Sequence, residues 1–164
     1  MGVIPTGSSV REEGKVHNSP LTLTMDIQDL YQEIILDHSR HPRNFGKPEG
    51  EFREAEGSNP SCGDSVRVFV KIGFPHQLIE DVHFLGRGCA ICMASASLMT
   101  EVVRQKKVEE IKTLIENFQA FLTGKEKRNA EIPEELFPLK GVRQFPARVK
   151  CALLPWHALE KIIP

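Results

Sequence analysis

The 164-residue sequence lacks three features that mark particular classes of protein. It has no apolar run approaching the roughly 18 residues of a membrane-spanning helix, and residues 1–20 contain no hydrophobic segment of the signal-peptide type. It also has no basic excess, because 21 Lys and Arg residues stand against 22 Asp and Glu residues, whereas nucleic-acid-binding domains are normally basic. We therefore expect a cytoplasmic protein with neither a membrane nor a nucleic acid as its partner.

Cysteine is scarce, and the sequence has no internal repeat. In the cytosol the four cysteines are more often reduced, metal-bound or catalytic than joined as disulfides. The length and the apolar content of 40% are enough for one domain with a substantial core. We predict this domain over residues 25–164, after a disordered tail over residues 1–24 that is rich in Gly, Ser and Pro.

Hydrophobic periodicity predicts an α+β fold. Apolar residues recur at helical spacing in four segments, 26–40, 89–104, 108–122 and 146–163. The segments with the character of strands are 51–57, 66–71 and 78–85. Because the strands come early in the chain and the helices mostly follow them, we expect a small antiparallel sheet of about three strands, with helices packed mainly on one face.

Two further features concern the C-terminal third of the chain. Residues 124–145 are first highly charged and then rich in proline, which indicates an insertion with one short helix near 133–137. Pro155 lies inside the last predicted helix and is expected to kink or split it.

Three of the four cysteines lie where a thiolate is favoured over a thiol. Cys62 lies in the polar turn Ser61-Cys62-Gly63-Asp64, Cys89 follows Gly86-Arg87-Gly88 at a predicted helix start, and Cys151 lies in the first turns of the last helix. Backbone amides and the helix dipole favour an anion at such places. Asp64, two residues after Cys62, would add an oxygen ligand.

The pair Cys89 and Cys92 leaves more than one interpretation open. A Cys-x-x-Cys pair at a strand-to-helix junction resembles a thioredoxin-type redox site, and it is also a common half of a zinc site. The sequence has no second such pair. Four cysteine ligands, three cysteines with Asp64, and a dithiol redox site are all compatible with the spacing. His38 and His41 are interpreted as packing or hydrogen-bonding residues.

Several separated motifs resemble those of the IscU-like, NifU N-terminal family. They are Leu36-Asp37-His38, Pro42-Arg43-Asn44, Ser61-Cys62-Gly63-Asp64, Gly88-Cys89-Ala90-Ile91, Ala94-Ser95-Ala96-Ser97 and Arg148-Val149-Lys150-Cys151. The resemblance covers about residues 26–163. Two details are similar to the SufU branch: Lys150 stands where scaffold members carry His, and 124–145 matches an insertion that SufU-type members carry.

The resemblance implies an iron–sulfur cluster assembly protein with zinc held by Cys62, Asp64, Cys89 and Cys151. A SufU-type member takes persulfide sulfur from a SufS-like, pyridoxal-phosphate cysteine desulfurase and passes it to a SufB-containing scaffold. On this basis we expect a sulfur carrier and not a conventional turnover enzyme, with Cys62 as the acceptor and Arg148 in support. The alternative is a scaffold with iron, on which a [2Fe–2S] cluster is assembled on the same ligands. Cys92 replaces a more usual Ser and is interpreted as a bystander.

Overall fold

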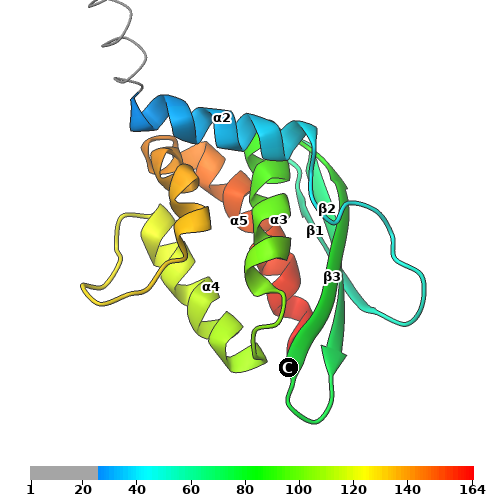
Figure 1. The fold of residues 1–164 in the computed structure, drawn as a ribbon. Helices are drawn as coiled ribbons and strands as arrows, with labels where there is room; N and C mark the ends of the chain where they lie inside the picture. The colour runs from blue at the N-terminus through cyan, green and yellow to red at the C-terminus, as the bar shows by residue number, and fades with distance from the viewer. Residues whose placement is uncertain (1–25) are drawn as a thin grey trace, which may run out of the picture. The chain divides into compact units, whose positions relative to one another are not determined.

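The computed structural model describes residues 26–164, so the tail predicted over residues 1–24 lies outside the described residues (Figure 1). The chain divides into two units, Met1–Leu30 and Tyr31–Pro164. The described end of the first unit begins helix α2 (Ile27–Arg40), where the carbonyl of Asp26 accepts hydrogen bonds from the amides of Asp29 and Leu30. The sheet, the core and the candidate site lie within the second unit.

Three antiparallel strands form the sheet, and they confirm the prediction. These are β1 (Arg53–Asn59), β2 (Asp64–Gly73) and β3 (Leu78–Arg87), in the order β1-β2-β3. Val66, Val68 and Val70 of β2 are fully buried, whereas Arg67 and Lys71 are exposed. Because successive side chains of a strand point to opposite faces, the three valines turn one face of the sheet toward the core.

Two helices, α3 (Ala90–Val103) and α5 (Pro146–Ile162), pack on that face. Helix α4 (Val108–Leu122) and the 3-10 helix η1 (Glu134–Gln144) pack against α5 and against each other. Figure 1 shows α3 and α5 beside the strands, and both contact the sheet and each other. Ala94, Ser95, Ala96 and Ser97 are buried, and their small side chains allow the close packing of α3. Within residues 26–164, no helix has the length and apolar character that crossing a membrane requires.

Two local predictions need correction. The predicted short helix near 133–137 is a longer 3-10 helix that extends to Gln144. The expectation that Pro155 would split the last helix is wrong, because α5 runs from Pro146 to Ile162 without interruption. Pro155 cannot donate a hydrogen bond to the carbonyl four residues earlier, at a cost of about 3 kcal/mol. The burial of most of α5, including the whole of Trp156, offsets that cost.

Different groups contact the two edges of the sheet. Along β3, the amide of Phe84 donates to the Asn44 carbonyl at 3.0 Å, and the amide of Ile79 donates to the Lys106 carbonyl at 2.9 Å. Loop segments thus cover both ends of β3. The β1 edge carries the exposed charges of Arg53, Glu54 and Glu56. There the Lys161 ammonium donates to the carbonyl of Glu56 at 2.9 Å.

Candidate metal centre

The turn between β1 and β2 presents Cys62 to solvent. The amides of Cys62 and Gly63 donate to the carbonyl of Asn59 at 3.1 and 2.9 Å, and Gly63 has a φ of +73°, which favours glycine. The side-chain amide of Asn59 donates to Cys62 Sγ at 3.6 Å. Cys62 is therefore exposed on a hydrogen-bonded turn, and the Asn59 side chain contacts its sulfur.

Asp64 begins β2, and its carboxylate is buried, with 2% of the residue exposed. Its Oδ1 accepts a hydrogen bond from the backbone amide of Cys89 at 2.9 Å. Its Oδ2 lies 3.9 Å from Cys89 Sγ. The carboxylate is thus fixed at the junction of β3 and α3.

The first turns of α5 bring Cys151 to the same place. Cys151 is buried, and its Sγ lies 3.6 Å from Cys62 Sγ, although these residues are 89 positions apart in the sequence. Ligand atoms of Cys62, Asp64 and Cys151 all lie within 4.8 Å of one another. Cys89 contacts Asp64 but stands outside that set of three. The structure therefore gathers three of the four predicted ligands and places the fourth beside them.

The chemistry of these donors suits a divalent cation. Burial raises the pKa of the Cys151 thiol strongly, and the Asp64 and Cys62 side chains add to the effect. Without a cation, burial and the neighbouring acidic side chains therefore favour the neutral thiol of Cys151 over its thiolate. A bound divalent metal reverses this preference and deprotonates a coordinating thiol. Thiolates with one carboxylate are ligands that zinc accepts.

Arg148 lies on the first turn of α5, at the same cluster. Its pKa is raised, chiefly by the side chain of Cys151 and next by that of Cys89. The guanidinium is exposed, so it adds a solvent-screened positive charge beside these two sulfurs. The supporting role of Arg148 stays a prediction.

Cys92 lies in the core and not in the cluster. It is fully buried, and burial raises the pKa of its thiol to about 12, with smaller contributions from Asp64, Cys89 and Cys62. All four cysteines, which lie within the described residues, are free thiols. A neutral thiol packed in the core supports the interpretation of Cys92 as a bystander.

Three residues shape the site through contacts that the sequence did not predict. Asn59 donates to Cys62 Sγ, Gly88 leaves room for the Asp64 carboxylate, and Ser95 bonds to the carbonyl of Ala152, next to Cys151. The glycine next to a cysteine and the Asn-Pro turn were visible in the sequence. Their partners lie far away in the chain, so the contacts themselves were not.

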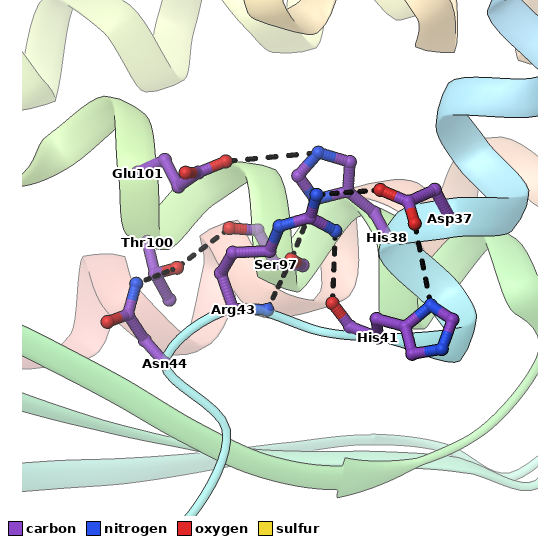
Figure 2. A network of polar contacts seen from close by, with 8 residues as sticks. All are labelled: Asp37, His38, His41, Arg43, Asn44, Ser97, Thr100 and Glu101. Atoms are coloured by element: carbon purple, nitrogen blue, oxygen red, sulfur yellow. Dashed lines mark hydrogen bonds and ion pairs between the residues drawn. The ribbon is translucent and has the colours of Figure 1, made fainter.

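His38 takes part in a second polar network, away from the sulfurs (Figure 2). Its Nδ1 lies 2.8 Å from Ser97 Oγ, which also accepts the backbone amide of Arg43 at 2.8 Å. Because the Ser97 oxygen already accepts the Arg43 amide, we assign the Ser97 hydroxyl as the donor and His38 Nδ1 as the acceptor of the second hydrogen bond. The remaining ring nitrogen, Nε2, then carries its proton toward Glu101, at 3.8 Å. His38 is thus a hydrogen-bonded residue, as predicted.

The same network fastens the loop after α2 to α3. Figure 2 shows the Arg43 guanidinium between Asp37 and the carbonyl of His41, with nitrogen–oxygen distances of 2.6 and 3.0 Å. The side-chain amide of Asn44 donates to the hydroxyl of Thr100 at 2.9 Å. The Pro42-Arg43-Asn44 motif therefore has a structural explanation in these contacts.

A large hollow in the described part of the chain lies elsewhere. It has a volume of about 1020 Å³ and lies between α4 and the segment 126–137. Its walls include Leu114, Phe121 and Phe137 together with charged residues of both signs, and none of its lining residues is a cysteine. The candidate chemistry therefore belongs to a surface cluster and not to this hollow.

Comparison with known proteins places this chain in a family. Residues 30–152 match the family model of the NifU-like N-terminal domain. The chain belongs to that family. A zinc-dependent sulfurtransferase, SufU of Bacillus subtilis, is 37% identical over 141 residues, which are 86% of this chain and 94% of that protein. IscU of Streptococcus pyogenes, an iron–sulfur cluster assembly scaffold protein, is also 37% identical, over 84% of each chain.

A solved structure of the same family agrees with the fold. A protein of Fervidobacterium islandicum, described as a candidate scaffold for iron–sulfur cluster assembly in the SUF system, superposes with a TM-score of 0.70. It is 34% identical, and the match covers 80% of this chain and 95% of that one. The two proteins therefore share the α+β arrangement over most of their length.

Proposed function

We propose that this protein is a zinc-dependent sulfur acceptor of iron–sulfur cluster assembly. The observation that carries the proposal is the meeting of Cys62, Asp64 and Cys151 within 4.8 Å, with Cys62 exposed to a partner. Cys89 contacts Asp64, and a small movement of its side chain would complete a set of four ligands. When bound, zinc supplies a redox-inert centre that keeps the thiols deprotonated and exchanges its ligands readily.

Cys62 is the proposed acceptor because it is the exposed thiol of the set. Its thiolate attacks the outer sulfur of a persulfide on the partner enzyme, a reaction of the thiol–disulfide exchange type. One S–S bond forms on Cys62 and one breaks on the partner, whose cysteine leaves as a thiolate. The proton of the outer sulfur stays with it, so that Cys62 ends as a persulfide with no net oxidation. Arg148 offers a positive charge to the anionic sulfurs.

Two observations favour sulfur transfer over cluster assembly. Lys150 occupies the position before Cys151 where scaffold members of the family carry His. The relative from B. subtilis is named a zinc-dependent sulfurtransferase, and the match covers 94% of its length. The partners that follow from this proposal are a SufS-like cysteine desulfurase as the sulfur donor and a SufB-containing scaffold as the receiver.

The second candidate function is a scaffold that assembles a [2Fe–2S] cluster on the same ligands. It is supported by the S. pyogenes relative, which has the same 37% identity to this chain as the B. subtilis protein and is named a scaffold. Cluster and zinc would compete for the same side chains, so that the metal content of the purified protein separates the two functions.

Elemental mass spectrometry on protein purified without chelator or metal-affinity resin tests the proposal. We expect about one zinc per chain, released during purification from the weakened sites of Asp64→Ala and Cys151→Ser and kept in Cys92→Ser. Iron with acid-labile sulfide would favour the scaffold instead. A protein with neither metal, in which Cys89 and Cys92 form a disulfide, would contradict both functions.

The role of Cys62 is tested by loading sulfur from a cysteine desulfurase supplied with cysteine. Cys62→Ala should keep part of its zinc through Asp64, Cys89 and Cys151 while losing the ability to carry persulfide. Mass spectrometry of the intact protein detects the added sulfur directly. Undiminished persulfide on the Cys62→Ala variant would assign the acceptor to another cysteine.

A further inference from the structure

The two oxygens of the Asp64 carboxylate have different surroundings. Oδ1 accepts the backbone amide of Cys89 at 2.9 Å, whereas Oδ2 is the oxygen beside Cys89 Sγ, at 3.9 Å. With only 2% of the residue exposed, the side chain has little room to turn. One oxygen is therefore held by the main chain, and the other lies beside the sulfur of Cys89.

Gly88 makes this arrangement possible. A Cβ atom on Gly88 would be too close to Asp64 Oδ1, and the three atoms nearest to it all belong to the side chain of Asp64. The φ angle of Gly88 lies outside the left-handed region, so an alanine could adopt this backbone conformation. The position needs glycine because of the space that the carboxylate occupies, and not because of the backbone.

We propose that Gly88 and the Cys89 amide are positioning groups for the metal ligand Asp64. They hold Oδ1, so that Asp64 offers Oδ2 alone and binds the metal through one oxygen. This inference rests on the proposed function, since it concerns how the cluster binds a divalent metal. Partners of this kind orient metal ligands, and their loss typically costs about 10–100-fold in metal affinity.

Zinc affinity, measured by competition with a chromophoric chelator, tests the proposal on Gly88→Ala, Asp64→Ala and the double variant. We expect Gly88→Ala to bind zinc about 10–100-fold more weakly than the wild type. In the Asp64→Ala background the carboxylate is missing, so that adding Gly88→Ala should change the affinity less than about twofold. Circular dichroism of the metal-free proteins controls for folding.

Cobalt(II) in place of zinc gives a second measurement. Gly88→Ala should keep the thiolate-to-cobalt charge-transfer absorption, because its cysteines are unchanged, and should alter the ligand-field bands, because the oxygen ligand is displaced. Asp64→Asn should preserve the hydrogen bond to the Cys89 amide through its amide oxygen. It should nevertheless bind zinc as weakly as Asp64→Ala, because its NH₂ group replaces Oδ2.

The outcomes separate this inference from the proposed function. A wild-type protein that binds neither zinc nor cobalt would overturn both. Wild-type affinity and an unchanged cobalt spectrum in Gly88→Ala would overturn the inference alone, as would an equal loss of affinity on adding Gly88→Ala to Asp64→Ala. If Gly88→Ala does not fold, the double variant should fold again, and a failure to do so would place the collision elsewhere than at Asp64.

Discussion

The hydroxyl of Ser95 on α3 donates a hydrogen bond to the carbonyl oxygen of Ala152 on α5, with 2.6 Å between the two oxygens. The same hydroxyl accepts the indole N–H of Trp156 at 3.0 Å. Ser95 and Trp156 are fully buried. This contact sets the position of α5, and therefore of Cys151, relative to the helix that begins after Cys89.

Replacing Ser95 with alanine should destabilise the protein by about 1–3 kcal/mol, because it leaves the indole N–H and the Ala152 carbonyl buried without their partner. Urea unfolding of the metal-free protein measures the loss. Ser58→Ala is a matched control, because Ser58 is exposed and its replacement should change the free energy of unfolding by no more than about 0.5 kcal/mol. Equal stabilities of the two variants would contradict a structural role for the Ser95 hydroxyl.

Removing the metal should lower the midpoint of thermal unfolding. Zinc at about 100 times its dissociation constant adds about 2.7 kcal/mol to stability, which corresponds to roughly 8 °C for a domain of this size. Cys151→Ser should lose the difference between zinc-loaded and chelator-treated protein, and Cys92→Ala should keep it. A shift that depends on Cys92 would make that residue a ligand.

The stability of the metal-free protein should fall as the pH drops below about 6.5 because of His38. The pKa of His38 is lowered by burial and then by the charge of Arg43, against the opposite effects of Glu101 and Asp37. In this range the unfolded chain, with its histidine pKa of about 6.5, binds more protons than the folded protein. The stability contributed by neutral His38 is thus complete above about pH 6.5 and is lost toward the lower folded pKa.

Urea unfolding at a series of pH values measures this dependence. His38→Gln should reduce the slope, whereas replacing His41, whose side chain is 77% exposed, should leave it unchanged. Identical slopes in wild type and His38→Gln would exclude His38 as the source.

Arg148→Ala should slow persulfide acceptance by about two- to fivefold, the size expected for one solvent-screened charge. Rapid-quench mass spectrometry of Cys62 loading gives the rate. Arg148→Lys should recover part of it by restoring the charge, and Lys150→Ala, on the same turn of α5, is the control. If Lys150→Ala has the larger effect, the decisive charge lies at Lys150.

Periodicity predicted the helices and strands because each depends on neighbours close in the sequence. The alternation of Val66, Val68 and Val70 was enough to indicate the buried face of β2. The prediction that Pro155 would split the last helix was wrong, because the tertiary burial of α5 outweighs the hydrogen bond that proline cannot donate. The extent of η1 was missed because its packing against α3, α4 and α5 is not local.

The sequence predicted only part of the candidate site. Turn chemistry and position at helix starts indicated Cys62, Asp64, Cys89 and Cys151 one at a time, and the family resemblance brought them together. The 3.6 Å approach of Cys62 and Cys151 depends on the placement of α5 against β1 and β2. The need for glycine at position 88 depends on Asp64, 24 positions earlier in the chain. Neither relationship can be predicted from residues that are close together in the sequence.

Among the described residues, β1 pairs with β2 alone, so the outer edge of β1 has no strand partner. A free strand edge is a template for pairing with another chain and so for aggregation. On β1 the charges of Arg53, Glu54 and Glu56 oppose such pairing, and the Lys161 ammonium already occupies one carbonyl of the edge. These charges therefore oppose the pairing of another chain next to the exposed thiol of Cys62.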